Sequence, residues 1–294
     1  MPFCTIRIEN DQHPPYHPPQ SFLTLIPPWP NNKKKSPNEV LIKANNIALN
    51  FRGFAVATGK YPFPIKDNVV PSSDLSGEVV SVGSHVDDFD EGDKHHSLCG
   101  CYDGVLRQYI VLPSSALVKI PSGTELSFAQ LSALVCTGTT ARNALYGNVP
   151  LKPGQPVLLF GTGGVSVTGL ILANAAGTTT IITSSCDDEL AQEVLKITSG
   201  HGANFVLENG GAGTIVQSLD AVAYGGNIAV IGFLASCPQV EMPDFAALAL
   251  GKGAVVRGIM VGSKQQLEDV MRFVTSKPLN VPDEKIFGFG RDEM

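Results

Sequence analysis

The chain has 294 residues, long enough for two domains with large buried cores, and no apolar run in it approaches the length of a membrane span. Its net charge of −6, without a long basic block, argues against nucleic acid and anionic membrane surfaces as partners. Six scattered cysteines, and an N-terminus that lacks the pattern of a signal peptide, predict a soluble cytoplasmic protein with reduced thiols.

The first part of the chain reads as short strands. Residues 1–37 are rich in proline, which cannot pair inside a sheet, so we predict an extended and partly disordered segment around one strand near 22–26. Further strands are predicted at 39–43, 75–83, 104–112 and 116–120. Many short strands joined by turns predict a small β-barrel-like domain over residues 1–120.

The pattern changes after Pro121. Residues 127–146 have helical spacing, and apolar strand-like runs then alternate with helical ones. The predicted strands are 156–160, 178–183, 205–208, 227–233 and 255–261, and the predicted helices are 164–173, 189–198, 214–224, 245–251 and 264–275. Strands that alternate with helices predict an α/β domain with a doubly wound parallel sheet over residues 121–272.

A glycine-dense turn follows the first strand of this sheet. Gly161 permits a tight turn, Gly163 lets backbone amides approach an anion, and the next helix offers its N–H groups and positive dipole end. Gly164 and Val165 belong to the same turn, and Ser166 stands where the third glycine of a dinucleotide fingerprint would be. The turn predicts a pyrophosphate site, although alone it could equally be an ordinary glycine turn.

The end of the second strand bears on the identity of the dinucleotide. Ser184 and Ser185 follow strand 178–183, where a dinucleotide fold meets the adenosine ribose. Acidic residues, which would repel a 2′-phosphate, come only at 187–189, and they can equally start a solvated helix. We therefore predict NADP(H) as the cofactor, with NAD(H) as the alternative.

Several strings along the chain resemble the medium-chain dehydrogenase/reductase superfamily, in particular its zinc-independent, quinone-oxidoreductase-like members. The strings are Ala48-Leu-Asn50-Phe-Arg52, Gly59-Lys-Tyr61-Pro62, Ser73-Asp74-Leu-Ser-Gly77-Glu-Val-Val-Ser-Val-Gly83, Gly161-Thr-Gly-Gly-Val165, Gly225-Gly-Asn-Ile-Ala-Val-Ile-Gly232 and Val256-Arg-Gly-Ile-Met-Val-Gly262. The resemblance implies a GroES-like catalytic domain over 1–120 that is completed by 273–294, and a Rossmann domain over 121–272. It also implies that NAD(P)H reduces a small-molecule carbonyl, quinone or activated double bond.

The resemblance implies catalytic residues as well. Tyr61 matches the position of a proposed proton donor in related enoyl reductases, although it could equally pack between prolines as a structural residue. The zinc ligands of zinc-dependent relatives match Asn50, Ser73 and Cys136, and one thiol cannot hold a catalytic zinc ion, so we predict no metal. Asn50, at the vacated metal position, could hydrogen-bond the substrate oxygen. A second string with metal-binding residue types, His95-His96-x-x-Cys99-x-Cys101, is better explained as loop residues.

Other positions match the nicotinamide pocket and the dimer interface of the family. Thr140 matches a position beside the nicotinamide ring. Two pairs at strand ends match positions that line the pocket, and they are Gly232 with Phe233 and Val261 with Gly262. The strand 255–261 pairs across a two-fold axis in relatives, so we predict a homodimer.

Three departures from the family pattern leave the activity open. A short segment at 95–102 replaces the usual substrate loop, the helix at 189–198 follows where another strand is expected, and the chain ends before the usual last helix and strand. The third strand of the Rossmann sheet is therefore predicted to be missing. The alternative to a reductase is a truncated, non-catalytic family member that acts as a binding or scaffold protein.

Overall fold

A computed structural model describes residues 4–7, 36–86, 102–121, 123–184, 189–235, 237–277, 279–282 and 285–289. The chain divides into two compact units. The first unit comprises Phe3–Val135 and Pro282–Met294, and the second unit comprises Cys136–Val281, apart from two residues at the N-terminus. Among the described residues, no helix combines the length and the apolar character that a membrane span requires.

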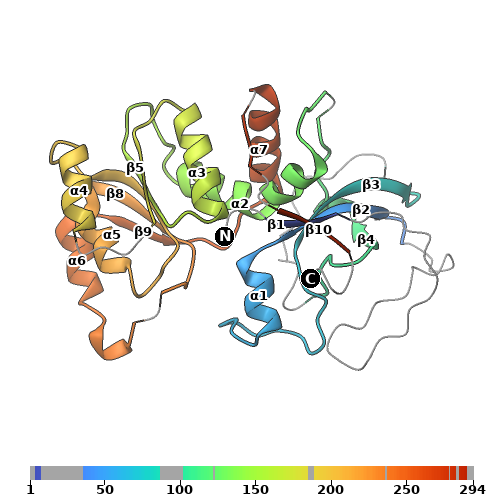
Figure 1. Ribbon diagram of the computed structural model, residues 1–294, viewed down its shortest axis with the longest axis horizontal. Helices are drawn as coiled ribbons and strands as arrows, with labels where there is room; N and C mark the ends of the chain where they lie inside the picture. Colours follow the sequence, from blue (N-terminus) through green and yellow to red (C-terminus); the bar gives the residue numbers. More distant parts are fainter. Residues whose placement is uncertain are drawn as a thin grey trace. The chain divides into compact units, whose positions relative to one another are not determined.

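The first unit is built on a five-stranded sheet (Figure 1). Its strands are β1 (Cys4–Arg7), β2 (Glu39–Leu49), β3 (Asp74–Val82), β4 (Tyr109–Pro113) and β10 (Lys285–Gly288). The strand order is β10-β1-β2-β3, and β4 also pairs with β2. The long strand β2 pairs with β1, β3 and β4, and its pairing with β3 shifts register twice, which bends the strand. Alternate residues of β2, among them Val40 and Ile42, are buried in the core of this unit.

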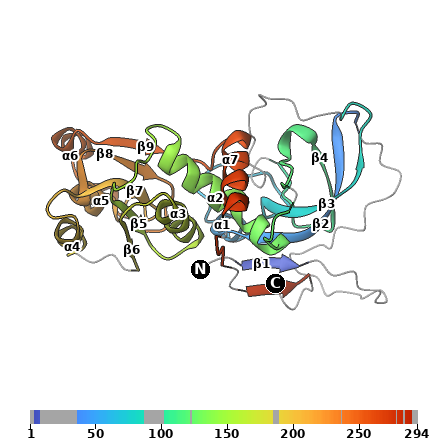
Figure 2. The same cartoon turned by 90° about the horizontal axis from the view of Figure 1, so that it is seen from above.

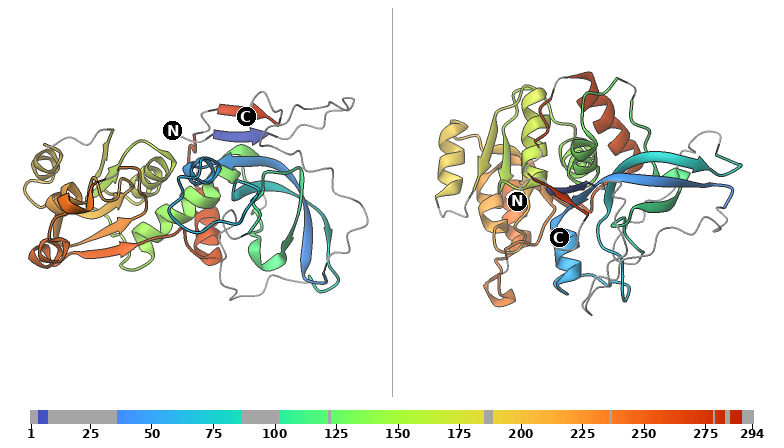
Figure 3. Two further views of the ribbon diagram at one scale, coloured as in Figure 1. Left: turned by 90° about the horizontal axis from the view of Figure 1, so that it is seen from below. Right: turned by 45° about the vertical axis from the view of Figure 1, so that its right-hand side comes forward.

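The strands at the two ends of the chain lie side by side. Cys4 to Arg7 pairs in parallel with Lys285 to Gly288, and antiparallel with the end of β2 (Figures 2 and 3). The C-terminal segment therefore completes the sheet of the first unit. Neither β1 nor β10 was among the predicted strands, and the strand predicted near 22–26 lies outside the described residues.

Two further elements of the first unit differ from the sequence prediction. Residues 116–120 form no strand, because the chain passes through a short 3-10 helix, η1 (Ser114–Ala116), and then runs on without a pairing partner strand. An unpredicted helix, α1 (Phe51–Ala57), follows β2 directly. Its seven residues are held by burial of Ala55 and Val56, which shows tertiary packing outweighing the weak helix propensity of glycine and valine.

The second unit is a parallel sheet with helices on both faces. Its strands are β5 (Val157–Phe160), β6 (Thr180–Thr183), β7 (Ala203–Glu208), β8 (Val222–Val230) and β9 (Val255–Gly258), in the order β6-β5-β7-β8-β9. All neighbouring strands pair in parallel. The described residues contain no strand between β6 and β7, as the sequence predicts. The fold is thus α/β, with a Rossmann-type sheet of five strands.

Helices pack on both faces of this sheet, because successive side chains along each strand point to opposite faces. Leu158 and Val206 face a core formed with α4 (Leu190–Ile197), α5 (Ile215–Ala221) and α6 (Phe245–Lys252). Leu159 and Leu207 point to the opposite face, where α3 (Gly164–Ala175) packs. The helices α2 (Phe128–Tyr146), which begins in the first unit, and α7 (Lys264–Ser276) are joined by an ion pair between Arg142 and Asp269.

The approach of α3 to the sheet depends on Gly169. A Cβ atom at this position would lie 2.8 Å from Leu159 and 2.9 Å from Leu207, closer than side chains normally approach. The helical Gly251 of α6 is the opposite case, because an added Cβ would meet nothing within 4 Å. The two glycines therefore separate the effect of packing from the effect of helix propensity.

We predict that Gly169→Ala destabilises the protein and that Gly251→Ala stabilises it. Overpacking at Gly169 costs about 1–3 kcal/mol, which exceeds the roughly 0.5–1 kcal/mol that alanine gains over glycine in a helix. Only the gain applies at Gly251. Urea unfolding followed by circular dichroism measures both variants against the wild type, and equal or higher stability of Gly169→Ala would contradict the packing described here.

Candidate active site

The glycine turn after β5 has the geometry of an anion site. Gly161 has a φ of +77°, in the left-handed region, and an added Cβ there would meet nothing within 4 Å. Its glycine is therefore needed for the backbone conformation. Helix α3 begins at Gly164, and its N-cap residue Gly163 offers no side chain to the first N–H groups. Those groups and the positive end of the helix dipole suit a pyrophosphate.

Ser166 occupies the third-glycine position of the fingerprint without filling the anion site. Its side chain is fully buried, and Oγ donates to the carbonyl oxygen of Phe160 at 2.7 Å. Nδ2 of Asn209 donates to the same carbonyl and to Ser166 Oγ, each at 2.9 Å. The serine thus turns toward the sheet, and Asn209 ties the end of β7 to the glycine turn.

A buried carboxylate shapes the loop that follows β7. Glu208 has no solvent exposure, and Oε1 accepts from the backbone N–H groups of Gly210 at 2.7 Å and Gly211 at 2.9 Å. The hydroxyl of Thr214 donates to Oε1, and that of Ser218 donates to Oε2. Four donors therefore satisfy the buried Glu208 side chain within the protein, and they link the loop after β7 to the start of α5.

The loops after β7 and β8 approach each other through their backbones. A Cβ on Gly232 would lie 2.1 Å from the carbonyl oxygen of Asn209, and one on Gly211 would lie 2.7 Å from that of Gly232. Only glycine fits at such distances. Gly232, predicted as a pocket residue, is therefore required by the contact between these two loops, and Phe233 beside it is 40% exposed.

The predicted cofactor residues lie along one edge of the sheet. Each group of predicted residues follows a strand of the sheet. The residues after β5 are Gly161, Gly163, Gly164 and Val165, and the residue after β6 is the exposed Ser184. The residues after β8 are Gly232 and Phe233, and those after β9 are Val261 and Gly262. Because the strands are parallel, their carboxyl ends share one edge, which is where open α/β sheets bind ligands. Ser185 lies outside the described residues. Thr140 comes from α2 and is buried.

The last of these loops packs against α2. A Cβ on Gly262 would lie 2.9 Å from the methyl group of Thr139 and 2.3 Å from Oε1 of Gln266. Thr139 directly precedes Thr140 on the helix, so the turn of α2 that carries Thr140 lies beside the loop that contains Gly262. The described part of the second unit therefore gathers the candidate cofactor residues that the sequence predicts around a single edge.

The candidate catalytic residues belong to the first unit. Asn50 follows β2, and its Nδ2 donates to Oδ2 of Asp74 at 2.7 Å. Ser73 Oγ donates to Oδ1 of Asp74 at 2.6 Å. Asp74 is the first residue of β3 and is 2% exposed. Asn50 and Ser73 are the residues that match zinc-ligand positions, and both direct their polar side chains to one carboxylate.

This arrangement fixes the orientation of the Asn50 amide. An ionised carboxylate only accepts hydrogen bonds, so the NH₂ group of Asn50 must face Asp74. One N–H and the Oδ1 atom of Asn50 are left for other partners. Cys136, the third matching position, lies in the second unit. Within the described residues no group of three His, Cys, Asp or Glu side chains could hold a metal ion, and the string 95–101 lies outside them.

The segment that carries Asn50 and Tyr61 also carries several other aromatic side chains. The Tyr61 ring packs edge-on against Phe63, with 5.4 Å between the ring centroids. Phe51 and Phe54 of α1 have centroids 6.0 Å apart. The side chains of Phe51, Phe54 and Phe63 are about half exposed, at 50%, 56% and 49%. The segment therefore presents apolar, aromatic surface.

Comparison with known proteins decides the family. Residues 36–122 match the family model of the alcohol dehydrogenase GroES-like domain, and residues 165–276 match that of the zinc-binding dehydrogenases. A zinc-type alcohol dehydrogenase-like protein of Schizosaccharomyces pombe is 35% identical over 301 residues, which cover 87% of this chain and 86% of that protein. The chain belongs to the medium-chain dehydrogenase/reductase superfamily.

Other members of the superfamily give the same answer. A quinone oxidoreductase-like protein 2 homolog of Nematostella vectensis is 32% identical, over 77% of this chain and 66% of that protein. A solved structure of a putative alcohol dehydrogenase from Sinorhizobium meliloti 1021 superposes with a TM-score of 0.72 at 31% identity, covering 84% of this chain and 83% of that one. The expected GroES-like and Rossmann-type folds are confirmed.

Membership of the superfamily explains which functional groups sequence reasoning found and which it missed. The glycine turn and the strand ends carry recognisable strings. Glu208 and Asn209 were not singled out, although an acidic residue at the end of an apolar strand, followed by a glycine pair, was a usable signal. Asp74 was noted only as part of a string, because nothing in the sequence shows that it is buried.

Medium-chain dehydrogenases/reductases act with a nicotinamide cofactor, and the glycine turn described here fits its pyrophosphate.

We predict that Asn209→Ala weakens binding of a nicotinamide dinucleotide about five- to tenfold. The variant removes two hydrogen bonds that hold the glycine turn to β7, each worth roughly 0.5–1.5 kcal/mol. Asn204→Ala is the matched control, because Asn204 lies at the amino end of the same strand. Isothermal titration calorimetry measures both. Equal affinity of Asn209→Ala and Asn204→Ala would show that the link to the turn does not matter for binding.

Proposed function

We propose that this medium-chain dehydrogenase/reductase is an NADP(H)-dependent reductase of a conjugated carbonyl, enone or quinone that works without zinc. The observation that carries the proposal is the hydrogen-bonded group of Asn50, Ser73 and Asp74 at the matching metal positions. Amide and hydroxyl groups are not the thiolate and imidazole ligands that zinc prefers. The Asp74 carboxylate also accepts a hydrogen bond on each oxygen. The residues therefore do not fit a catalytic zinc ion.

Without a metal, the protein must stabilise the charge that grows on the substrate oxygen during hydride transfer. When bound, the nicotinamide cofactor supplies the hydride. Asn50 has one N–H left after its bond to Asp74, and this group donates to the substrate oxygen in our proposal. Tyr61, on the next loop of the same unit, gives the proton. The buried Asp74 keeps the Asn50 amide turned in the required direction.

The preference for NADP(H) rests on the end of β6. Ser184 is exposed there, and a hydroxyl can donate to a 2′-phosphate without the repulsion of a carboxylate. Asp187 and Asp188 come later in the chain and lie outside the described residues. NAD(H) is the alternative, and a direct comparison of the affinities for the two cofactors decides between them.

The aromatic surface supports a flat, apolar substrate. Phe51 and Phe54 are on the helix that follows Asn50, and Phe63 packs on Tyr61. Half-exposed aromatic rings gain from covering a planar conjugated molecule and gain little from a small polar alcohol. A quinone oxidoreductase of Pseudomonas syringae pv. tomato superposes with a TM-score of 0.68 at 25% identity, over 85% of this chain and 84% of that one, which is in keeping with this class of substrate.

We also propose a homodimer formed through segment 255–261, in a protein of the cytoplasm. β9 is the last strand of its sheet, and Val255 is 42% exposed. An edge strand with an exposed valine suits pairing with a second copy. The scattered cysteines support the cytoplasmic location.

A non-catalytic binding protein remains the second candidate, because the second unit has five strands and β6 forms its edge on the adenosine side.

We predict that the purified protein binds NADPH with a dissociation constant in the micromolar range, more tightly than NADH. Nicotinamide fluorescence during titration measures both. Absence of binding at millimolar concentrations of either cofactor would leave the binding-protein function ahead.

We predict that Asn50→Ala lowers kcat for 1,4-naphthoquinone about 100-fold, because a hydrogen-bond donor to a developing oxyanion is worth that much. Tyr61→Phe is expected to lower kcat about tenfold or more, since it removes a proton donor. NADPH affinity should stay unchanged in both. Ser73→Ala is the control, because it keeps the bond between Asn50 and Asp74. If Ser73→Ala lost as much activity as Asn50→Ala, the role of Asn50 would be structural.

A further inference from the structure

Val261 has a backbone conformation that its side chain disfavours. Its φ is +58°, in the left-handed region, where a β-branched side chain crowds the backbone. The other non-glycine residues with positive φ in the described ranges are Asn68, Ser72 and Ser199, and none of these is β-branched. A strained residue persists only where its surroundings hold it. Such strain at a strand end next to the cofactor edge points to a functional constraint on this peptide.

The group that holds this peptide is the side chain of Asn143 on α2. Its Nδ2 donates to the carbonyl oxygen of Val261 at 2.9 Å. Its Oδ1 accepts from Nη1 of Arg257 and from Nε2 of Gln266, each at 3.1 Å. Because Oδ1 meets two donors and Nδ2 meets an acceptor, only one orientation of the amide satisfies all three contacts.

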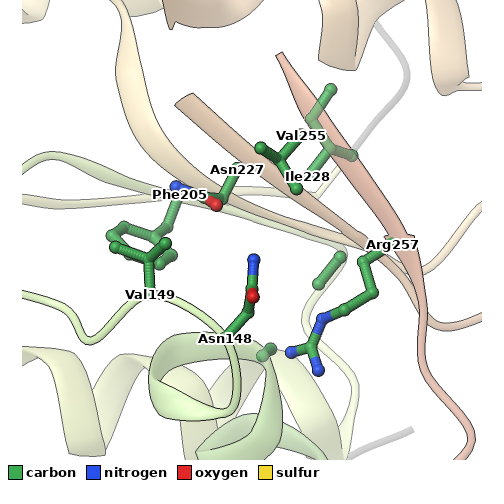
Figure 4. Close-up of a pocket in the computed structure, with 9 residues that line it drawn as sticks. Asn148, Val149, Phe205, Asn227, Ile228, Val255 and Arg257 are labelled. Atoms are coloured by element: carbon green, nitrogen blue, oxygen red, sulfur yellow. The ribbon is translucent and has the colours of Figure 1, made fainter. Parts of the chain in front are cut away.

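The two supporting side chains are themselves fixed. Oε1 of Gln266 accepts from the backbone N–H of Ser263 at 2.8 Å, within the capping box that starts α7. Arg257 extends from β9 along the edge of a small pocket that Asn148 also lines (Figure 4). Its Nη2 donates to the main-chain carbonyl of Asn143 at 2.6 Å. Asn143 therefore joins α2, β9 and the start of α7.

We infer that Asn143 is a positioning residue for the nicotinamide end of the cofactor, an inference that rests on the proposed function. Asn143 follows Thr140 by three residues, so the two lie on the same face of α2. Its amide holds the Val261 peptide in the left-handed conformation, next to Gly262 in the loop that follows β9. Oδ1 and Nδ2 are both engaged within the protein, so Asn143 acts on the cofactor through Val261.

The test uses Asn143→Asp, which has the same shape. Aspartate still accepts from Arg257 and Gln266 but cannot donate to the Val261 carbonyl. Two probes are titrated by calorimetry into the full chain: NADPH, and 2′-phospho-ADP-ribose, which lacks the nicotinamide. Asn174→Asp is the matched control, because it adds the same charge to the same unit at an exposed amide that accepts from Thr180.

We expect Asn143→Asp to bind NADPH about tenfold more weakly, a loss of about 1.4 kcal/mol, while its affinity for 2′-phospho-ADP-ribose stays within about twofold. The control should match the wild type for both probes. Equal weakening for both probes, or no weakening for either, would overturn the inference. Failure of the wild type to bind either NADPH or NADH would instead overturn the proposed function, and the inference with it.

A second variant covers the case in which Asn143→Asp does not fold. Arg257→Lys keeps the positive charge but loses the fork that grips Asn143 at two atoms. We expect it to weaken NADPH binding about threefold without changing the binding of 2′-phospho-ADP-ribose, and to shift the fluorescence of bound NADPH because the nicotinamide is held less firmly. If Arg257→Lys changed both affinities together, the network would have a general structural role, which would contradict the inference.

Discussion

A buried carboxylate has to find its hydrogen bonds inside the protein, and the cofactor edge of this molecule is built around that requirement. Glu208 draws two backbone N–H groups and two hydroxyls to itself, which bends the chain sharply after β7. The bend places Asn209 where it can hold the glycine turn and places Gly232 against the same loop. The loops after β5, β7 and β8 are thus linked by contacts within the protein, and such contacts lower the cost of ordering these loops when a ligand binds.

Each unit contains an asparagine side chain whose amide is oriented by its hydrogen-bond partners. In the first unit, Asp74 orients the amide of Asn50, and in the second unit Arg257 and Gln266 orient the amide of Asn143. An asparagine amide has a donor end and an acceptor end, so the groups around it determine which way it faces. Zinc-dependent relatives use a cation for the task that the first of these amides is proposed to perform. The exchange replaces a metal charge by an oriented dipole.

Much of the fold could be predicted because the relevant signals are local. The apolar run of β5 and the glycine turn stand together in the sequence, and Glu189-Leu190 leading straight into a helical pattern reveals the absent strand. The pairing of β1 with β10 could not be predicted, since it joins segments near opposite ends of the chain. Helix α1 was missed because its formation depends on burying Ala55 and Val56, and Glu208 was missed because burial of a charge depends on partners that only the folded chain assembles.

The position of the absent strand also says something about how such a sheet can shorten. In the six-stranded order of this fold type, the strand beyond β6 is the outermost on its side and the point where the chain turns back. Its removal leaves every remaining pair of neighbours intact, and one helix, α4, carries the chain across β5 to β7 on the face that it shares with α5. Loss of an inner strand would instead have required its two neighbours to pair with each other. A doubly wound sheet can therefore lose its outermost strand without any change in the order of the remaining strands. What changes is the width of the sheet on the side where the adenosine half of a ligand would bind.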